Sequence, residues 1–135
     1  PEVTEKLVAA IGSGKYDFIV CNLANADMVG HSGKLDAAIK AVEAVDVALG
    51  ILEAAIRSVG GEMLISADHG NLEMMRADDG QPHTQHTVGP VPLVYAGRRA
   101  TLAPGALRDL APTVLALMAL PQPAQMTGHS LVTFA

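Results

Sequence analysis

Three groups of aspartate and histidine residues in this sequence have spacings that suit metal ligands. The groups are Asp27 with His31, Asp68 with His69, and His83 with His86. Carboxylate and imidazole ligands together suit Mn²⁺ or Zn²⁺ better than Ca²⁺, which takes oxygen ligands only. The residue types therefore predict a site for a divalent transition metal, provided that the fold brings the groups together.

Each group has a simpler structural interpretation when it is taken alone. A D-x-x-x-H spacing beside a glycine is more often a turn in which the carboxylate accepts a hydrogen bond. The run Asp68-His69-Gly70 fits a turn that ends a strand, and histidines in a polar loop are more often solvated than bound to metal. The metal interpretation therefore depends on all three groups reaching one place.

The elements around these groups predict that place. Short apolar runs without polar alternation indicate strands covered on both faces, at residues 17–22, 62–67 and 92–96. Apolar residues at three- and four-residue steps indicate helices at residues 3–11, 34–59 and 108–118, the last becoming regular near Pro112. This alternation predicts an α/β fold with an open, mostly parallel sheet flanked by helices.

Ligands of such sheets bind beyond the carboxyl ends of the strands. The first two groups follow the first two predicted strands, and the third group leads into the third strand. We therefore expect the groups to converge at one edge of the sheet. The polar segment 75–89, which contains the third group, is expected to be a functional or mobile loop.

Composition limits the other classes of function. The chain has 135 residues, 50% of them hydrophobic and 17% charged, which is typical of a globular sequence of single-domain length. Its net charge is −5, and the only basic cluster is Arg98 with Arg99, which argues against nucleic-acid binding. No apolar run reaches the ~20 residues of a membrane span. The lone Cys21 cannot form an internal disulfide and fits a reducing compartment, and a first residue of Pro1 predicts that the natural N-terminus is missing.

Several segments, taken in order, resemble signatures of the cofactor-independent phosphoglycerate mutases, a family of the alkaline phosphatase superfamily. The segments are residues 25–33, 67–71, 82–87 with 90–92, 109–113, and 120–123 with 126–128. The resemblance covers nearly the whole chain. It implies an alkaline-phosphatase-like fold, of which residues 1–135 are the C-terminal part of the metal-binding phosphatase domain.

The resemblance also implies roles for individual residues. The implied ligands are Asp27, His31 and His86 for one ion and Asp68 and His69 for a second, with His83 as a supporting neighbour. The implied cofactors are two Mn²⁺ or similar divalent ions, without 2,3-bisphosphoglycerate. Ser32 and His129 depart from the family pattern, which more commonly has Thr and Arg at these positions.

The implied activity is the interconversion of 2-phosphoglycerate and 3-phosphoglycerate through a phosphoserine, in glycolysis and in the cytoplasm. Two ions can bind the serine oxygen and the leaving oxygen on either side of the transferred phosphoryl group. None of the serines here, at positions 13, 32, 58, 66 and 130, has the context of that nucleophile. No catalytic residue is therefore assigned, and the chain alone is expected to be inactive. The nucleophile and the phosphoglycerate-binding insert are expected upstream in the same polypeptide.

Two other functions stay open at this point. A metal-dependent phosphatase or phosphosugar mutase on the same scaffold would use the same ligands, and the upstream sequence would distinguish it. A non-catalytic metal-binding or interaction domain is the third alternative. It would gain support if the full reading frame began with a Met just before Pro1.

Overall fold

The computed structural model describes residues 2–135, which form two compact units: the first extends to Val94, and the second runs from Tyr95 to Ala135. All three Asp/His groups belong to the first unit. The candidate site therefore lies within the first unit.

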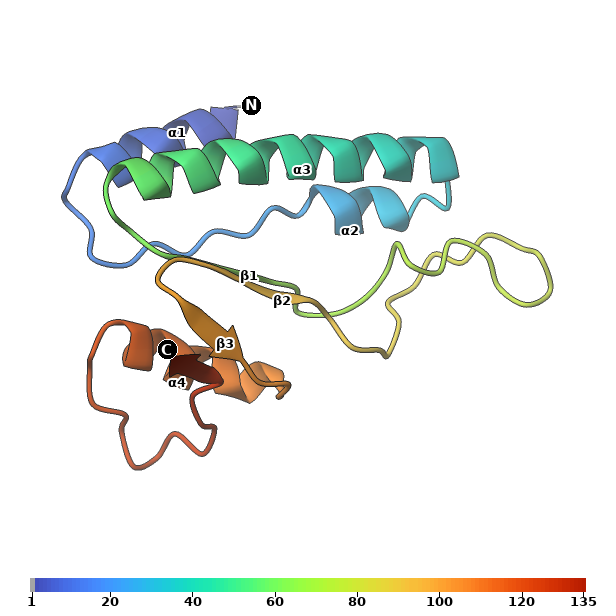
Figure 1. Ribbon diagram of the computed structural model, residues 1–135. Coiled ribbons are helices and arrows are strands. Elements are labelled where there is room, and N and C mark those ends of the chain that lie inside the picture. Colours follow the sequence, from blue (N-terminus) through green and yellow to red (C-terminus); the bar gives the residue numbers. More distant parts are fainter. Residues whose placement is uncertain (1) are drawn as a thin grey trace. The chain divides into compact units, whose positions relative to one another are not determined.

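Three helices form much of the first unit. They are α1 (Glu2–Gly12), α2 (Asn25–Gly30) and α3 (Leu35–Ser58). Figure 1 shows the long α3 lying against α1 and α2. The helices expected at residues 3–11 and 34–59 are thus confirmed, whereas the short α2 was not predicted.

Composition and one terminal glycine account for α3. The helix is rich in alanine, a strong helix former, and its buried residues Ala38, Ala41 and Leu52 lie on one face. Beyond its end, Gly60 has a φ of 71°, a left-handed conformation that glycine adopts without strain.

Two short strands, β1 (Met63–Ser66) and β2 (Leu93–Ala96), form a two-stranded sheet. They confirm the strands expected at residues 62–67 and 92–96. β2 begins in the first unit and ends in the second.

The strand expected at residues 17–22 is wrong. This segment is irregular, and Figure 1 draws it as a coil between α1 and α2. No strand among residues 2–135 pairs with it, and Phe18 and Val20 are 53% and 77% exposed. An apolar run forms a strand only where a neighbour takes up its backbone hydrogen bonds.

The second unit continues from β2 into a small antiparallel pair. Its elements are β3 (Ala100–Leu102), the 3₁₀ helix η1 (Leu107–Asp109), α4 (Leu110–Leu117) and β4 (Val132–Phe134). The pairing of β3 with β4 is antiparallel and was not predicted. η1 and α4 together confirm the helix expected at residues 108–118.

Buried polar residues hold the second unit together. Thr113 is completely buried, and its hydroxyl donates to the Asp109 carbonyl oxygen at 2.7 Å while accepting the Leu131 N–H at 3.0 Å. The Asp109 carboxylate accepts the backbone N–H groups of Ala106 and His129. These bonds attach the C-terminal segment to the start of α4.

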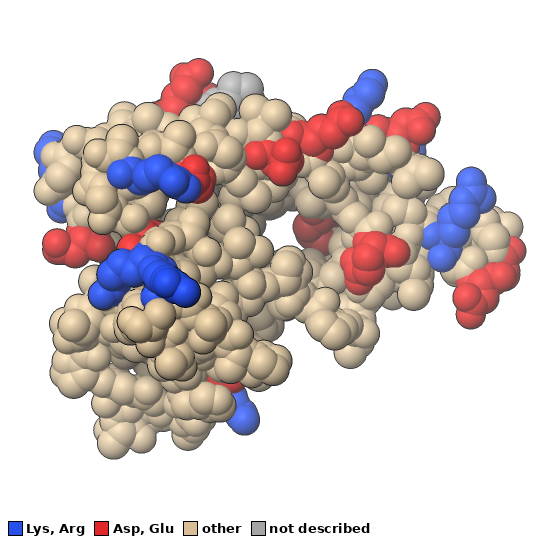
Figure 2. Space-filling view, viewed as in Figure 1, with Lys and Arg blue, Asp and Glu red and all other residues tan. Residues whose placement is uncertain are grey.

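Charged side chains are spread over the surface. On the face drawn in Figure 2, Lys and Arg residues stand singly or in small groups among acidic ones. None of the helices within residues 2–135 combines the length and the apolar character that crossing a membrane requires.

Candidate metal centre

Helix α2 carries the first Asp/His group. Asp27 lies in its first turn, and His31 is the residue that caps its C-terminus. Residues four apart on a helix lie one turn apart on the same face. The D-x-x-x-H spacing therefore brings the two side chains together, with His31 Nε2 3.2 Å from Asp27 Oδ1.

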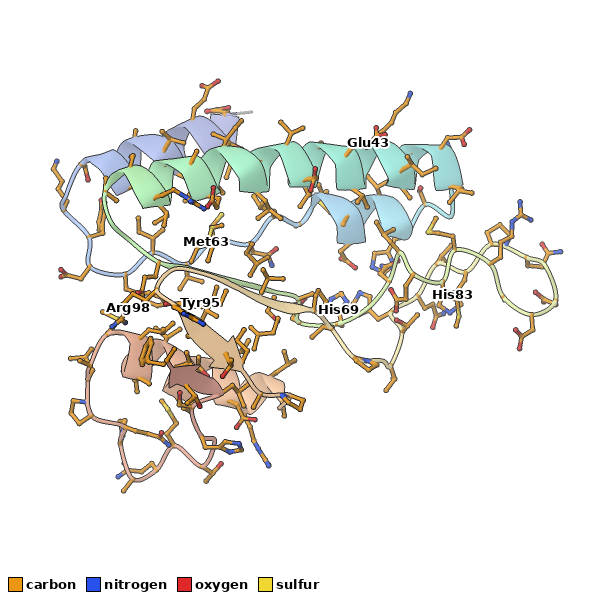
Figure 3. All side chains as sticks on the ribbon, in the orientation of Figure 1. Glu43, Met63, His69, His83, Tyr95 and Arg98 are labelled. Carbon is orange, nitrogen blue, oxygen red and sulfur yellow. The ribbon has the colours of Figure 1, made fainter. Side chains whose placement is uncertain are left out.

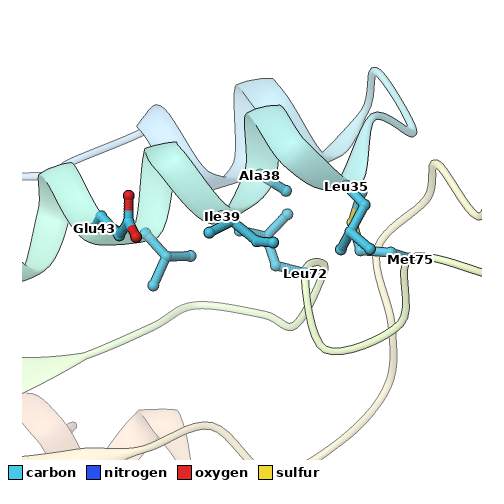
Figure 4. A pocket seen from close by; sticks show the side chains of 7 residues that line it. Leu35, Ala38, Ile39, Glu43, Leu72 and Met75 are labelled. Atoms are coloured by element: carbon cyan, nitrogen blue, oxygen red, sulfur yellow. The ribbon is translucent and has the colours of Figure 1, made fainter.

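The segment after β1 carries the second group and lies against α3. Figure 3 shows His69 beyond the end of β1. Figure 4 shows Leu72 and Met75, from the same segment, facing Leu35 and Ile39 of α3 around an apolar pocket. Leu72 and Met75 are partly buried there, whereas Leu35 and Ile39 remain 50% and 49% exposed.

The third group returns to the site through a closed loop. Arg76 and Pro82 form an antiparallel bridge, and between them Gly80 turns the chain with a φ of 81°. Farther along, the Thr87 N–H donates to the Gly70 carbonyl oxygen at 3.0 Å. This bond places the third group beside the second.

The first and third groups meet at Asp27. Its Oδ1 lies 3.2 Å from His31 Nε2 and 3.0 Å from His86 Nε2. The two imidazole nitrogens lie 3.1 Å apart, although their residues are 55 positions apart in the chain. The three atoms form a nearly equilateral triangle, which we call the Asp27–His31–His86 triangle. All three side chains are part-exposed, so a solute can reach them.

A hydrogen bond orients the imidazole of His31. Its Nδ1 lies 2.7 Å from the carbonyl oxygen of Thr84, which can only accept, so Nδ1 carries the proton. In the neutral ring, Nε2 then presents a lone pair towards Asp27 and His86. Orientation of this kind, by a backbone carbonyl, is typical of histidines that bind metals.

The triangle has the dimensions of a coordination site for an ion. An ion held at about 2.1 Å places neighbouring ligand atoms about 3.0 Å apart in octahedral and about 3.4 Å apart in tetrahedral coordination. The edges of 3.0, 3.1 and 3.2 Å lie within this range. Two imidazoles and one carboxylate therefore fit a divalent ion such as Mn²⁺ or Zn²⁺.

His69 joins the cluster through its ring. The ring stacks on that of His86, with centroids 3.6 Å apart and planes inclined by 18°. Ligand atoms of Asp27, His69 and His86 all lie within 4.8 Å of one another. The side chain of Asp68 is 75% exposed, and its Oδ1 lies 3.6 Å from His69 Nε2. The pair expected to serve a second ion thus adjoins the triangle, with Asp68 turned largely to solvent.

Asn71, to which the sequence assigned no role, holds the carboxylate at the centre of the cluster. Its Nδ2 donates to Asp27 Oδ1 at 2.9 Å, and only 5% of the residue is exposed. This hydrogen bond, and after it the charges of His31 and His86, lowers the pKa of Asp27 against a desolvation effect that raises it. Asp27 is therefore ionised at neutral pH, as a metal ligand must be.

Gly30 makes room for Asn71. A Cβ atom at residue 30 would lie 2.2 Å from Asn71 Oδ1 and 2.8 Å from Leu72 Cδ2, closer than side chains approach. The amide therefore packs directly against the backbone of α2. The signals in the sequence were a glycine directly before His31 and an Asn two residues after His69.

The two remaining histidines make other contacts. The His83 N–H donates to the Met75 carbonyl oxygen at 3.0 Å, and its buried ring Nδ1 has no hydrogen-bond partner among residues 2–135. Its supporting role stays a prediction. His129, in the second unit, has its Nδ1 3.5 Å from Asp109 Oδ1.

Comparisons with known proteins relate this chain to metalloenzymes. Residues 1–122 match the metalloenzyme superfamily. The chain is 63% identical to the 2,3-bisphosphoglycerate-independent phosphoglycerate mutase of Cellvibrio japonicus and 62% identical to that of Rhodopseudomonas palustris, each over 98% of this chain. The fold matches a crystal structure of Leishmania mexicana phosphoglycerate mutase at low cobalt concentration, with a TM-score of 0.88 and 33% identity over 99% of this chain.

The chain spans only about a quarter of the length of these relatives. It covers 26% of each bacterial mutase and 28% of the Leishmania mexicana chain. Within that part it shares their α/β fold. The chain therefore belongs to the metalloenzyme superfamily, in which it is similar to the 2,3-bisphosphoglycerate-independent phosphoglycerate mutases.

Proposed function

We propose that this chain is the C-terminal, metal-binding part of a 2,3-bisphosphoglycerate-independent phosphoglycerate mutase, which interconverts 2-phosphoglycerate and 3-phosphoglycerate. The observation that carries the proposal is the Asp27–His31–His86 triangle, with edges of 3.0–3.2 Å. It occurs in a chain 63% identical to a mutase of that name. Such an activity belongs to glycolysis, in the cytoplasm.

In this proposal the ligands divide between two divalent ions. Asp27, His31 and His86 hold one ion, and Asp68 and His69 contribute to the other. The proposed ions are Mn²⁺, and when bound they supply the positive charge that stabilises a transferring phosphoryl group.

The chain's own residues prepare the site for an ion. The Thr84 carbonyl keeps the proton on His31 Nδ1, so that Nε2 is available for binding. The Asn71 amide orients Asp27 and favours its ionised form. Stacking restricts the ring planes of His69 and His86.

The rest of the catalytic apparatus is proposed to lie outside these 135 residues, upstream in the same polypeptide. It comprises the serine that carries the phosphoryl group, further donors for the second ion and the cations that bind phosphoglycerate. In that longer polypeptide, β1 and β2 would belong to an open, mostly parallel sheet.

Calorimetric titration of the 135-residue chain with Mn²⁺ tests the metal site. One saturable site is expected, with a weaker second one, because two adjacent residues cannot enclose an ion. Asp27→Asn is expected to abolish the first site. The control Asp17→Asn, which changes an exposed carboxylate, is expected to retain it. A folded chain that binds no Mn²⁺ would refute the metal site.

A chimera tests the activity. This chain replaces the matched segment of the Cellvibrio japonicus mutase, and conversion of 3-phosphoglycerate to 2-phosphoglycerate is measured with Mn²⁺. Conversion that disappears on Asp27→Asn supports the proposal. Hydrolysis of phosphate esters without isomerisation would indicate a phosphatase instead. A folded chimera that binds Mn²⁺ and does neither would indicate a non-catalytic metal-binding domain.

A further inference from the structure

A carboxylate outside the expected ligand set connects the two segments that carry His69 and His86. Glu73 Oε2 accepts a hydrogen bond from the backbone N–H of Asn71 at 2.8 Å, and Glu73 Oε1 accepts one from the hydroxyl of Thr87. Asn71 lies two residues after His69, and Thr87 directly follows His86. One side chain therefore bonds to both segments.

Gly70 allows this close arrangement. A Cβ atom at residue 70 would lie 2.1 Å from Glu73 Oε1 and 2.2 Å from Thr87 Oγ1. The carboxylate and the hydroxyl thus pack directly against the Gly70 backbone, whose carbonyl oxygen also accepts the Thr87 N–H. The hydrogen bond from Thr87 lowers the pKa of Glu73, so Glu73 is an ionised acceptor at neutral pH.

The same carboxylate reaches Asp27 through Asn71. Glu73 accepts from the Asn71 backbone, and the Asn71 side chain donates to Asp27 Oδ1 at 2.9 Å. A continuous series of hydrogen bonds therefore runs from Thr87, beside one imidazole, through Glu73 and Asn71 to the central carboxylate.

We propose that Glu73 is a positioning residue of the metal centre, which sets the separation of Asp27, His69 and His86 through Asn71 and Thr87. Both carboxylate oxygens of Glu73 accept hydrogen bonds, one from the Asn71 N–H and one from the Thr87 hydroxyl, so Glu73 acts through those residues and not as a ligand. The inference rests on the metal site of the proposed function. Partners that orient metal ligands typically account for about 10- to 100-fold in metal affinity.

Co²⁺ binding to the 135-residue chain, followed by visible absorption, gives the first measurement. Glu73→Ala is expected to weaken binding by about 10- to 100-fold and to change the Co²⁺ spectrum. Glu73→Gln should recover much of the affinity, because its Oε1 can accept from the Asn71 N–H while its Nε2 donates to the Thr87 hydroxyl. Glu5→Ala, which removes an exposed carboxylate from α1, is the charge-matched control and should bind as the wild type does.

The second measurement needs no metal. In the chelator-treated chain, ring protons of His69 and His86 should give a nuclear Overhauser effect, because their centroids are 3.6 Å apart. Glu73→Ala should weaken this signal and Glu73→Gln should retain it. If Glu73→Ala does not fold, Thr87→Val removes the same hydrogen bond from the Thr87 side. Thr87→Ser, which keeps the hydroxyl, is its control.

The outcomes separate this inference from the proposed function. Wild-type Co²⁺ affinity and ring contact in both Glu73→Ala and Thr87→Val would overturn the role of Glu73. A wild-type chain that binds no Co²⁺ but shows a ring contact dependent on Glu73 would refute the metal site and still support positioning of the rings. Loss of both signals in these variants, with recovery in Glu73→Gln and Thr87→Ser, is the expected result.

Discussion

Replacement of Gly30 by alanine sets two opposing effects against each other. Gly30 is the last residue of α2 and has no left-handed φ, so alanine fits its backbone. Alanine is favoured over glycine in a helix by about 1 kcal/mol. Against this, the new Cβ would lie 2.2 Å from Asn71 Oδ1 and 2.8 Å from Leu72 Cδ2.

We expect the clash to dominate. Asn71 is 5% exposed and hydrogen-bonded to Asp27, so it has little room to move. Overpacking of this kind costs about 1–3 kcal/mol, which leaves a net destabilisation of about 0–2 kcal/mol after the helical gain. The larger effect is functional: displacement of the amide releases Asp27, and the Mn²⁺ affinity should fall by about 10- to 100-fold.

Two measurements on the 135-residue chain test this prediction. Urea unfolding followed by the helical circular dichroism signal measures stability, and calorimetry measures Mn²⁺ affinity. The control is Gly50→Ala on α3, where nothing lies within 4 Å of the new Cβ. It should raise stability by about 1 kcal/mol or less and leave Mn²⁺ affinity unchanged. A Gly30→Ala chain that is more stable than the wild type and binds Mn²⁺ equally well would refute the reasoning.

Three further predictions concern the second unit and the chain as a whole. Thr113→Val should destabilise the chain by about 1–3 kcal/mol in thermal unfolding, because it leaves the buried Leu131 N–H without its acceptor, whereas Thr113→Ser should lose much less. The N–H groups of Ala106 and then His129 lower the pKa of Asp109. The pKa of Asp109 in the folded chain therefore lies below its value in the unfolded chain. The contribution of ionised Asp109 to folding stability is complete at neutral pH and is lost as the pH falls from about 4 through the folded pKa. Acid unfolding should show this dependence in the wild type and not in Asp109→Asn. The purified chain with Mn²⁺ should not convert 3-phosphoglycerate to 2-phosphoglycerate, and turnover that survives repurification would contradict the proposed division of the site.

Local patterns predicted most of the helices and two strands. The alanine-rich run at residues 34–59 specifies α3 because helix propensity and apolar periodicity act over neighbouring residues. The apolar runs that became β1 and β2 were recognised for the same reason. The strand expected at residues 17–22 failed because a strand also needs a neighbour, which short-range sequence does not report. The β3–β4 pair was missed because each strand has only three residues and its partner lies about 30 positions away in the chain.

The sequence by itself determined the chemistry of the candidate site. Carboxylates and imidazoles in three groups were enough to indicate a divalent metal, because this inference depends on residue type. The choice of Asp27, His31 and His86 as one ligand set came from the resemblance to the phosphoglycerate mutases. The strand expected before Asp27 did not contribute, since Asp27 lies on α2.

Only the tertiary structure decided which atoms meet and what holds them. Asn71 and Asp27 are 44 positions apart, and His31 and His86 are 55 apart, so no local pattern reports their contacts. Glu73 had no predicted role, and only folding placed it between the segments of His69 and His86. Residue types state which bonds a side chain can make, whereas the packing of α2, the segment after β1 and the long loop selects the partners.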